Sequence, residues 1–166
     1  MTTSELRLRE FRDSDLDILA SMVGDAEQMR FYPRPKTRAE ASAWIDRNRA
    51  LYRERGYGSW LIELGPQLRF AGYCGIRPLD LEGVSEIEIG WHVHKRFWSQ
   101  GIATRTAKMA RDAAASRFGL SRLVAVVHPD HVASRRVAEN LGMRQERTTV
   151  LEDDYSAVIY AIELGG

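Results

Sequence analysis

The sequence has little of several features that would indicate a function directly. Its single cysteine, Cys74, cannot form an internal disulfide and has no companion thiols for a zinc or iron–sulfur site, so a reducing compartment is the expected setting. No apolar stretch approaches the ~20 residues that a membrane span requires. The N-terminus lacks the basic start and apolar run of a signal peptide. We therefore expect a soluble, cytoplasmic protein that does not bind a membrane.

An excess of charge of one sign is missing too. The 24 Lys and Arg residues nearly balance the 23 Asp and Glu residues, so no net field favours nucleic acid or an anionic membrane as a partner. What is present is apolar: 44% of the 166 residues are hydrophobic, which suffices for one sizeable core but not for two. No repeat, low-complexity tract or linker divides the chain, so residues 1–166 are expected to form a single domain.

Two helices are expected in the first third of the chain. The first would begin at Ser14 or Asp13, because either side chain can cap the free amide groups of a helix start. The second would begin at Thr37, which forms a capping box with Glu40, and apolar positions at helical spacing carry it to Arg55.

Apolar runs rich in β-forming residues predict strands. They cover residues 6–11, 59–64, 68–76, 86–93, 123–127, 143–150 and 157–164. The breaker-rich stretch from Pro78 to Gly83 would separate the third run from the fourth. Helical patterns at 104–118 and 132–141 complete the order of elements. This order predicts an α/β (α+β) fold, a mixed and mostly antiparallel twisted sheet of about seven strands with helices on both faces.

A glycine-bearing loop, residues 98–101, joins the strand at 86–93 to the alanine-rich helix. This is an arrangement that binds phosphate, because exposed backbone amides and the positive end of the helix dipole both point at the anion. Gly101 and Ala103 leave room for close approach, and a pyrophosphate is the expected guest. Taken alone, the glycine would favour a tight turn over a phosphate site.

Three motifs, in this order and spacing, resemble the GNAT superfamily. They are Glu88-Ile89-Gly90-Trp91, then Trp98-x-x-Gly101-x-Ala103, then His128-Pro129-Asp130-x-x-x-Ser134-Arg135-Arg136-Val137-x-x-x-Leu141-Gly142-Met143. The similarity spans nearly the whole chain and is strongest to the RimJ/RimL-like branch, which includes the bacterial ribosomal-protein alanine N-acetyltransferases and related small-molecule acetyltransferases. It implies an acetyl-CoA-dependent N-acetyltransferase that acts by direct attack of an amine in a ternary complex. It also implies a GNAT fold whose sheet is splayed between strands 4 and 5, with a kink or bulge near Gly90.

The resemblance also implies which residues hold the cofactor. The pyrophosphate would lie on the backbone amides of Ser99, Gln100, Gly101, Ile102, Ala103 and Thr104. The pantetheine arm would run past Trp91 and pair with the main chain of Val93 and His94. Where the family often has Asn, this chain has His131, which is larger and titrates near neutral pH. Arg136, with Arg135, would approach the 3'-phosphate or remain a solvated pair.

Catalysis by direct transfer needs a base, a polarised thioester carbonyl and an acid for the leaving thiolate. By resemblance, a backbone amide near Trp91 to Val93 would polarise the carbonyl. The base would be Glu88, with Glu86 on the same side of the strand as a second choice that would contact the substrate; both also fit a solvated strand face.

The acid is less directly indicated. Many GNAT enzymes use a tyrosine at the position that Ala138 occupies here. By resemblance to this branch, a serine one turn earlier takes that role, and Ser134 stands at that position; alternatively, Ser134 only caps or decorates the helix. Tyr155 is a further acid candidate with an alternative packing role. Tyr32 would contact the acceptor.

Alternatives from other classes remain. Ala138 and His131 also fit a non-catalytic CoA-binding module that regulates a partner. A dinucleotide-binding domain is excluded, because no Gly-x-Gly-x-x-Gly follows the first strand. The four histidines lack the carboxylate or cysteine spacing of a metal site, so no metal is expected. The acceptor stays open between a protein N-terminus and small amines such as polyamines, amino acids and amine antibiotics, and the resemblance allows a homodimer through the final hairpin.

Overall fold

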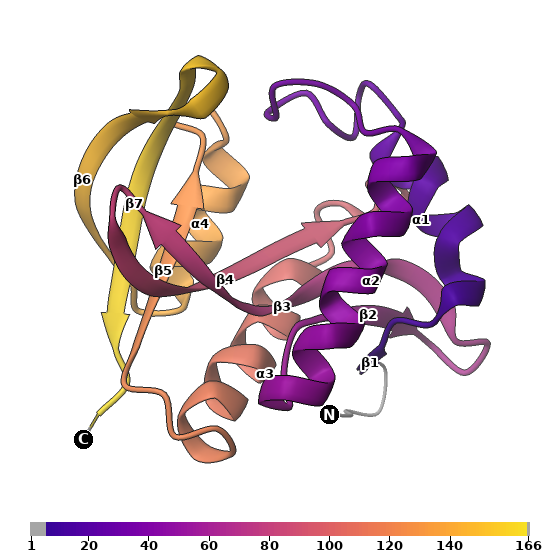
Figure 1. Cartoon of the computed structure of the whole chain (residues 1–166), viewed down its shortest axis with the longest axis horizontal. Coiled ribbons are helices and arrows are strands. Elements are labelled where there is room, and N and C mark those ends of the chain that lie inside the picture. Colours follow the sequence, from indigo (N-terminus) through magenta and orange to yellow (C-terminus); the bar gives the residue numbers. More distant parts are fainter. Residues whose placement is uncertain (1–5, 166) are drawn as a thin grey trace.

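The computed structural model describes residues 6–165, which form a seven-stranded sheet and four α-helices (Figure 1). The strands are β1 (Leu6–Glu10), β2 (Ser59–Leu64), β3 (Arg69–Leu81), β4 (Val84–Val93), β5 (Arg122–Val127), β6 (Arg144–Leu151) and β7 (Tyr155–Glu163). The helices are α1 (Leu16–Val23), α2 (Arg38–Arg55), α3 (Ile102–Ser116) and α4 (Val132–Asn140). The sheet order is β1-β2-β3-β4-β5-β7-β6.

Helices cover both faces of the sheet, as predicted. The helices α3 and α4 pack on one face, where the small side chains Ala107, Ala110 and Ala114 of α3 are fully buried and let the helix approach the strands closely. The helices α1 and α2 pack on the other face, around Leu19 and Ile45. Within residues 6–165, no helix is both long and apolar enough to cross a membrane.

The sheet opens between β4 and β5. All other neighbouring strands are antiparallel, whereas these two are parallel and pair only at Glu88 opposite Val124. Beyond that point β4 runs toward the α1 side and β5 toward the N-terminal end of α4 (Figure 1). The predicted splay between strands 4 and 5 is confirmed. The predicted bulge near Gly90 is absent from the β3–β4 pairing, whose register runs through Gly90 without a shift, so the strands separate by diverging in direction.

The β3–β4 hairpin is longer than the sequence pattern predicted. The stretch from Pro78 to Gly83 was expected to separate two strands, but β3 continues through Pro78 and turns only at Glu82 and Gly83, both with positive φ. Proline is tolerated because β2 pairs with β3 only as far as Gly75, so no partner strand lies on the side that the Pro78 nitrogen faces.

The two N-terminal helices begin differently. The Thr37 side chain accepts a hydrogen bond from the Glu40 amide at 3.1 Å, and the Glu40 carboxylate accepts one from the Thr37 amide, so the predicted capping box of α2 is confirmed. The expected cap of α1 by Ser14 or Asp13 is wrong. A 3-10 turn precedes α1, and the Asp15 carboxylate accepts instead from the backbone amide of Arg12 at 2.7 Å.

Candidate active site

A cavity of about 970 Å³ lies where β4 and β5 separate. Its walls come from both sides of the splay: β3 and β4, the end of β5, the start of α4, the α1–α2 loop, one face of α2 and the tip of the β6–β7 hairpin. Both predicted catalytic residues, Glu88 from β4 and Ser134 from α4, line this cavity, although they are 46 positions apart in the chain. The fold therefore brings the predicted base and the predicted acid to one site.

The backbone of β4 presents amide groups to this opening. The His94 amide donates to the Ala71 carbonyl at 2.8 Å, and the β3–β4 register is unshifted, so even-numbered residues of β4 pair with β3. The amides of Trp91 and Val93 therefore point away from β3, toward β5. Only Glu88 of β4 pairs with β5, so β5 does not pair with these residues. This is the backbone arrangement that polarisation of a carbonyl requires.

The main-chain contacts predicted for His94 and for the Val93 carbonyl are already made within the protein. The Val93 carbonyl accepts from the Gln28 side chain and from the Trp98 indole, each at 2.9 Å. The His94 amide is bonded to Ala71, and the His94 carbonyl accepts from the Phe97 amide at 2.8 Å. Of the predicted main-chain pair, the Val93 amide is the group that faces the splay.

Gly90 and Trp91 shape the floor of the cavity. A Cβ added at Gly90 would meet no atom within 4 Å, so the cavity reaches down to the backbone there. The Trp91 indole Nε1 donates to Ser134 Oγ at 3.3 Å across the splay. A hydroxyl that accepts a bond keeps its own proton for donation, so this contact orients Ser134 without using its proton.

The N-terminus of α4 is capped by His131. Its Nδ1 accepts from the Ser134 amide at 3.4 Å, so His131 and not Ser134 caps the helix, and the alternative that Ser134 serves as the cap is wrong. Burial, together with the nearby charges of Arg30 and His128, lowers the pKa of His131 to about 4. The expected titration near neutral pH is therefore wrong too. The ring stacks on Phe31 with centroids 4.3 Å apart.

Glu88 is held by a partner that the sequence pattern did not reveal. Arg77 Nε donates to its carboxylate at 2.8 Å from the facing position of the hairpin, and both residues line the cavity. The Glu88 side chain is 15% exposed, so water reaches it. The contact between Arg77 and Glu88 could be predicted from the sequence only if the β3–β4 register were known.

Aromatic groups also line the cavity. Tyr32, predicted to touch the acceptor, lines it with its ring 5.3 Å from that of His92. Tyr155 also lines it, and burial raises the pKa of its hydroxyl to about 12, so the group stays protonated at neutral pH.

Cys74 is fully buried in the α3-side core, and burial raises the pKa of its thiol to about 12. Its thiol is therefore no candidate for a covalent intermediate.

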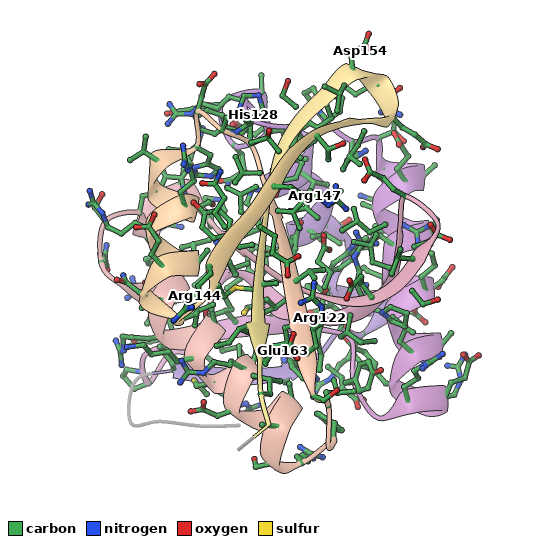
Figure 2. The ribbon with its side chains drawn as sticks, turned by 90° about the vertical axis from the view of Figure 1, so that its left-hand side faces the viewer. Arg122, His128, Arg144, Arg147, Asp154 and Glu163 are labelled. Carbon is green, nitrogen blue, oxygen red and sulfur yellow. The ribbon has the colours of Figure 1, made fainter. Side chains whose placement is uncertain are left out.

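Glu86, the second choice for the base and a predicted substrate contact, does not line this cavity. Its carboxylate is bound by Arg122 Nε at 3.1 Å, and the same guanidinium also binds Glu146 and Glu163, so that four strands are joined. Figure 2 shows Arg122 and His128 at opposite ends of β5, and only His128 lines the cavity. The alternation that placed Glu86 beside Glu88 was correct along the strand, but the cavity does not extend that far.

The predicted phosphate loop has an open geometry. Ser99 and Gly101 have positive φ angles of 62° and 74°, and α3 starts at Ile102, two residues before the predicted Thr104. No side chain caps this helix, and its first turn holds no acidic residue. A Cβ at Gly101 would meet nothing within 4 Å. The first-turn amides are therefore suited to an anion such as a pyrophosphate.

The two arginines of α4 have different roles. Arg135 donates to the Tyr160 hydroxyl at 3.1 Å and to the Pro129 carbonyl at 3.2 Å, so it ties α4 to the sheet. Arg136 is exposed and makes no ion pair within the described part of the chain, which leaves it for the predicted 3'-phosphate contact. Residues 6–165 contain no group of three His, Cys, Asp or Glu side chains that could hold a metal ion.

Comparison with known proteins gives a consistent result. The family model "Acetyltransferase (GNAT) domain" matches residues 5–144. The chain is 30% identical over 151 residues to the protein YkkB of Bacillus subtilis (strain 168), covering 89% of this chain and 87% of YkkB. It is 28% identical over 148 residues to the uncharacterised N-acetyltransferase YoaA of the same organism, covering 88% and 83%.

Solved structures share the fold. An acetyltransferase from Agrobacterium tumefaciens str. C58 superposes with a TM-score of 0.85 at 23% identity, covering 98% of this chain and 92% of that one. RimL, a ribosomal L7/L12 α-N-protein acetyltransferase in complex with coenzyme A, superposes with a TM-score of 0.74 at 22% identity, covering 98% and 96%. Since the family model spans most of the sequence, and the sheet opens beside an uncapped α3, the chain belongs to the GNAT family of acetyltransferases.

Proposed function

We propose that the protein is an acetyl-CoA-dependent N-acetyltransferase that transfers the acetyl group to a primary amine by direct attack in a ternary complex. The observation that carries this proposal is the cavity at the β4–β5 splay, which brings Glu88, the outward-facing Trp91 amide and the Ser134 hydroxyl together. The amine is that of a small molecule or of a protein N-terminus.

The residues present fit the donor. The amides at the start of α3 are free of side-chain caps, and the positive end of the helix dipole favours the pyrophosphate. From there the pantetheine arm would follow the edge of β4 whose amides do not pair with β5, as far as Gly90. The absence of a side chain at Gly90 leaves room for the thioester. Acetyl-CoA supplies the activated acyl group, and the chain supplies its orientation.

Each catalytic group then has one task. Glu88, reached by water and oriented by Arg77, accepts the proton of the attacking amine through a water molecule. The Trp91 amide donates to the carbonyl oxygen as negative charge develops there. As the C–S bond breaks, Ser134, held by the Trp91 indole, donates its proton to the departing thiolate and regains one from water. Ala138 is fully buried in α4 and carries no proton donor, so Ser134 is the acid on this helix, with Tyr155 as the alternative from β7.

The test is acceptor-dependent release of free thiol from acetyl-CoA, with a panel of N-terminal peptides, polyamines, amino acids and aminoglycosides. Glu88→Gln should lower kcat by roughly 100-fold or more, because general-base catalysis contributes that much, and should leave CoA affinity unchanged. Ser134→Ala should lower kcat less than Glu88→Gln does, because water can replace the hydroxyl as proton donor. Glu54→Gln, on the exposed face of α2, is the matched control.

One rival makes the opposite prediction. A non-catalytic CoA-binding module would bind CoA with no amine raising thiol release above background, and Glu88→Gln would change nothing. Tight CoA binding with a silent panel would favour the module. A chain that binds no CoA would contradict both readings.

A further inference from the structure

Residues 25–31, called here the strap, lie in the loop between α1 and α2 and cross from the end of β4 to the start of α4. In Figure 1 this loop projects from the α1–α2 side toward α4. Gln28, only 5% exposed, anchors one end: its side chain donates to the Val93 carbonyl at 2.9 Å and accepts from the Lys95 amide at 2.8 Å. Asp25 adds an ion pair to the Lys95 ammonium group at 2.9 Å.

The other end of the strap is held by ring stacking. Phe31 stacks on His131, the cap of α4. The strap therefore contacts three elements to which cofactor binding was assigned above. They are the end of β4 through Gln28, the loop that begins at Trp98 through Arg30, and the first turn of α4 through Phe31.

Arg30 extends from the strap between two aromatic faces. Its guanidinium carbon lies 4.8 Å from the ring centroid of Phe31 and 5.6 Å from that of Trp98, the residue that opens the phosphate loop. Aromatic faces fix the guanidinium group by its flat side and leave the N–H groups at its edge free to donate. Within residues 6–165 the Arg30 side chain makes no ion pair or hydrogen bond, and the residue is exposed.

A guanidinium group held in this way has the chemistry of a phosphate ligand, because its planar fork matches phosphate oxygens and its charge is permanent. We propose that Arg30 binds a phosphate group of CoA, acting together with the amides of residues 99–104. This inference rests on the proposed function, since it takes CoA as the ligand. The shared chemistry is a phosphate oxyanion, which comes either from the pyrophosphate or from the 3'-phosphate.

The test is calorimetric titration of the full chain with CoA, dephospho-CoA and pantetheine. Arg30→Gln should weaken CoA binding by about 10-fold, which equals about 1.4 kcal/mol, as expected for loss of one exposed charge-assisted contact. Arg30→Lys should restore part of the affinity by keeping the charge. Arg53→Gln, an exposed arginine of α2 that makes no ion pair within the described residues, is the matched control and should bind like the wild type.

The two shorter ligands separate the sources. If Arg30→Gln loses the same factor with dephospho-CoA, the contact is to the pyrophosphate; if the loss disappears, the contact is to the 3'-phosphate. Pantetheine has no phosphate, so its binding should not change. Wild-type CoA affinity in Arg30→Gln, or an equal loss with pantetheine, would overturn the proposal. Failure of the wild type to bind CoA would instead remove the proposed function itself.

Discussion

The N-termini of α2 and α3 are completed in opposite ways. Thr37 and Glu40 satisfy the first amides of α2 with their own side chains, and Arg34 pairs with the Glu40 carboxylate at 2.7 Å. The α3 helix begins after a left-handed Gly101 with no side-chain cap and no acid in its first turn. A helix that satisfies its own amides has nothing left for a ligand, whereas a helix that leaves them free has a built anion site. The α2 terminus is therefore completed by the protein itself, whereas the α3 terminus keeps the free amides on which the proposed CoA site depends.

Placing a glutamate at the third position of α3, as in α2, should have the largest effect on CoA affinity. Thr104 occupies the third helical position, as Glu40 does in α2, so Thr104→Glu places a carboxylate where the pyrophosphate is expected. Repulsion between like charges a few ångströms apart should weaken CoA binding on the order of 100-fold. The melting temperature should hold or rise, because an acid favours a helix start. Titration with CoA measures the loss of affinity, and thermal denaturation measures the melting temperature. Unchanged CoA affinity would contradict the proposal that the pyrophosphate binds at the start of α3.

A backbone change at the same terminus should have a smaller effect. Gly101→Val forces a β-branched residue to a φ of 74°, which costs about 1–2 kcal/mol. Because a Cβ would meet no atom beyond the neighbouring residues, the cost comes from the local backbone and not from a clash with another part of the fold. CoA affinity should fall about 10-fold as the loop reshapes. Gly83→Val, at a φ of 85° in the exposed hairpin turn, is a control that should lose stability but keep its CoA affinity.

Removing the α2 cap should affect stability alone. Thr37→Ala should lower the free energy of unfolding by about 1 kcal/mol, since the Glu40 amide loses its acceptor. Urea denaturation measures this loss, and CoA titration should give the wild-type affinity. A change in CoA affinity would show that the two termini are coupled, which the comparison does not predict.

The smallest effect concerns the third terminus, that of α4. The folded-state pKa of His131 is about 4, below its ordinary value of 6.5, so protons bind the unfolded chain preferentially and stability falls as pH drops from 6.5 toward 4. Glu40, whose pKa the Arg34 hydrogen bond lowers to about 2, keeps the α2 cap intact over this range. His131→Asn should change stability at pH 7 by less than about 0.5 kcal/mol, because asparagine also caps helices.

Melting curves at several pH values test this contrast. In His131→Asn the decline between pH 6.5 and 4 should be shallower than in the wild type. It should not vanish, because burial lowers the pKa of His92 to about 4 as well. An unaltered pH profile would mean that His131 does not contribute to the decline.

Several features could be predicted from the sequence because their causes are local. The Thr37–Glu40 cap, the alanine face of α3 and the order of elements depend on residues a few positions apart, and all are present. Predictions for residues whose structure depends on distant partners were wrong or were not made. Pro78 continues a strand because β2 stops short, and Glu86 leaves the site because Arg122 binds it.

The sequence by itself determined the family motifs, the elements and the identity of Glu88 and Ser134 as candidates. Only the tertiary structure decided that these two line one cavity, that Arg77 holds the glutamate, and that the strap reaches across to α4. The physical reason is the distance along the sequence over which each effect acts. Periodicity and capping act within one turn or one strand, whereas these contacts join residues that are far apart in the sequence and meet only when the sheet has formed and opened between β4 and β5.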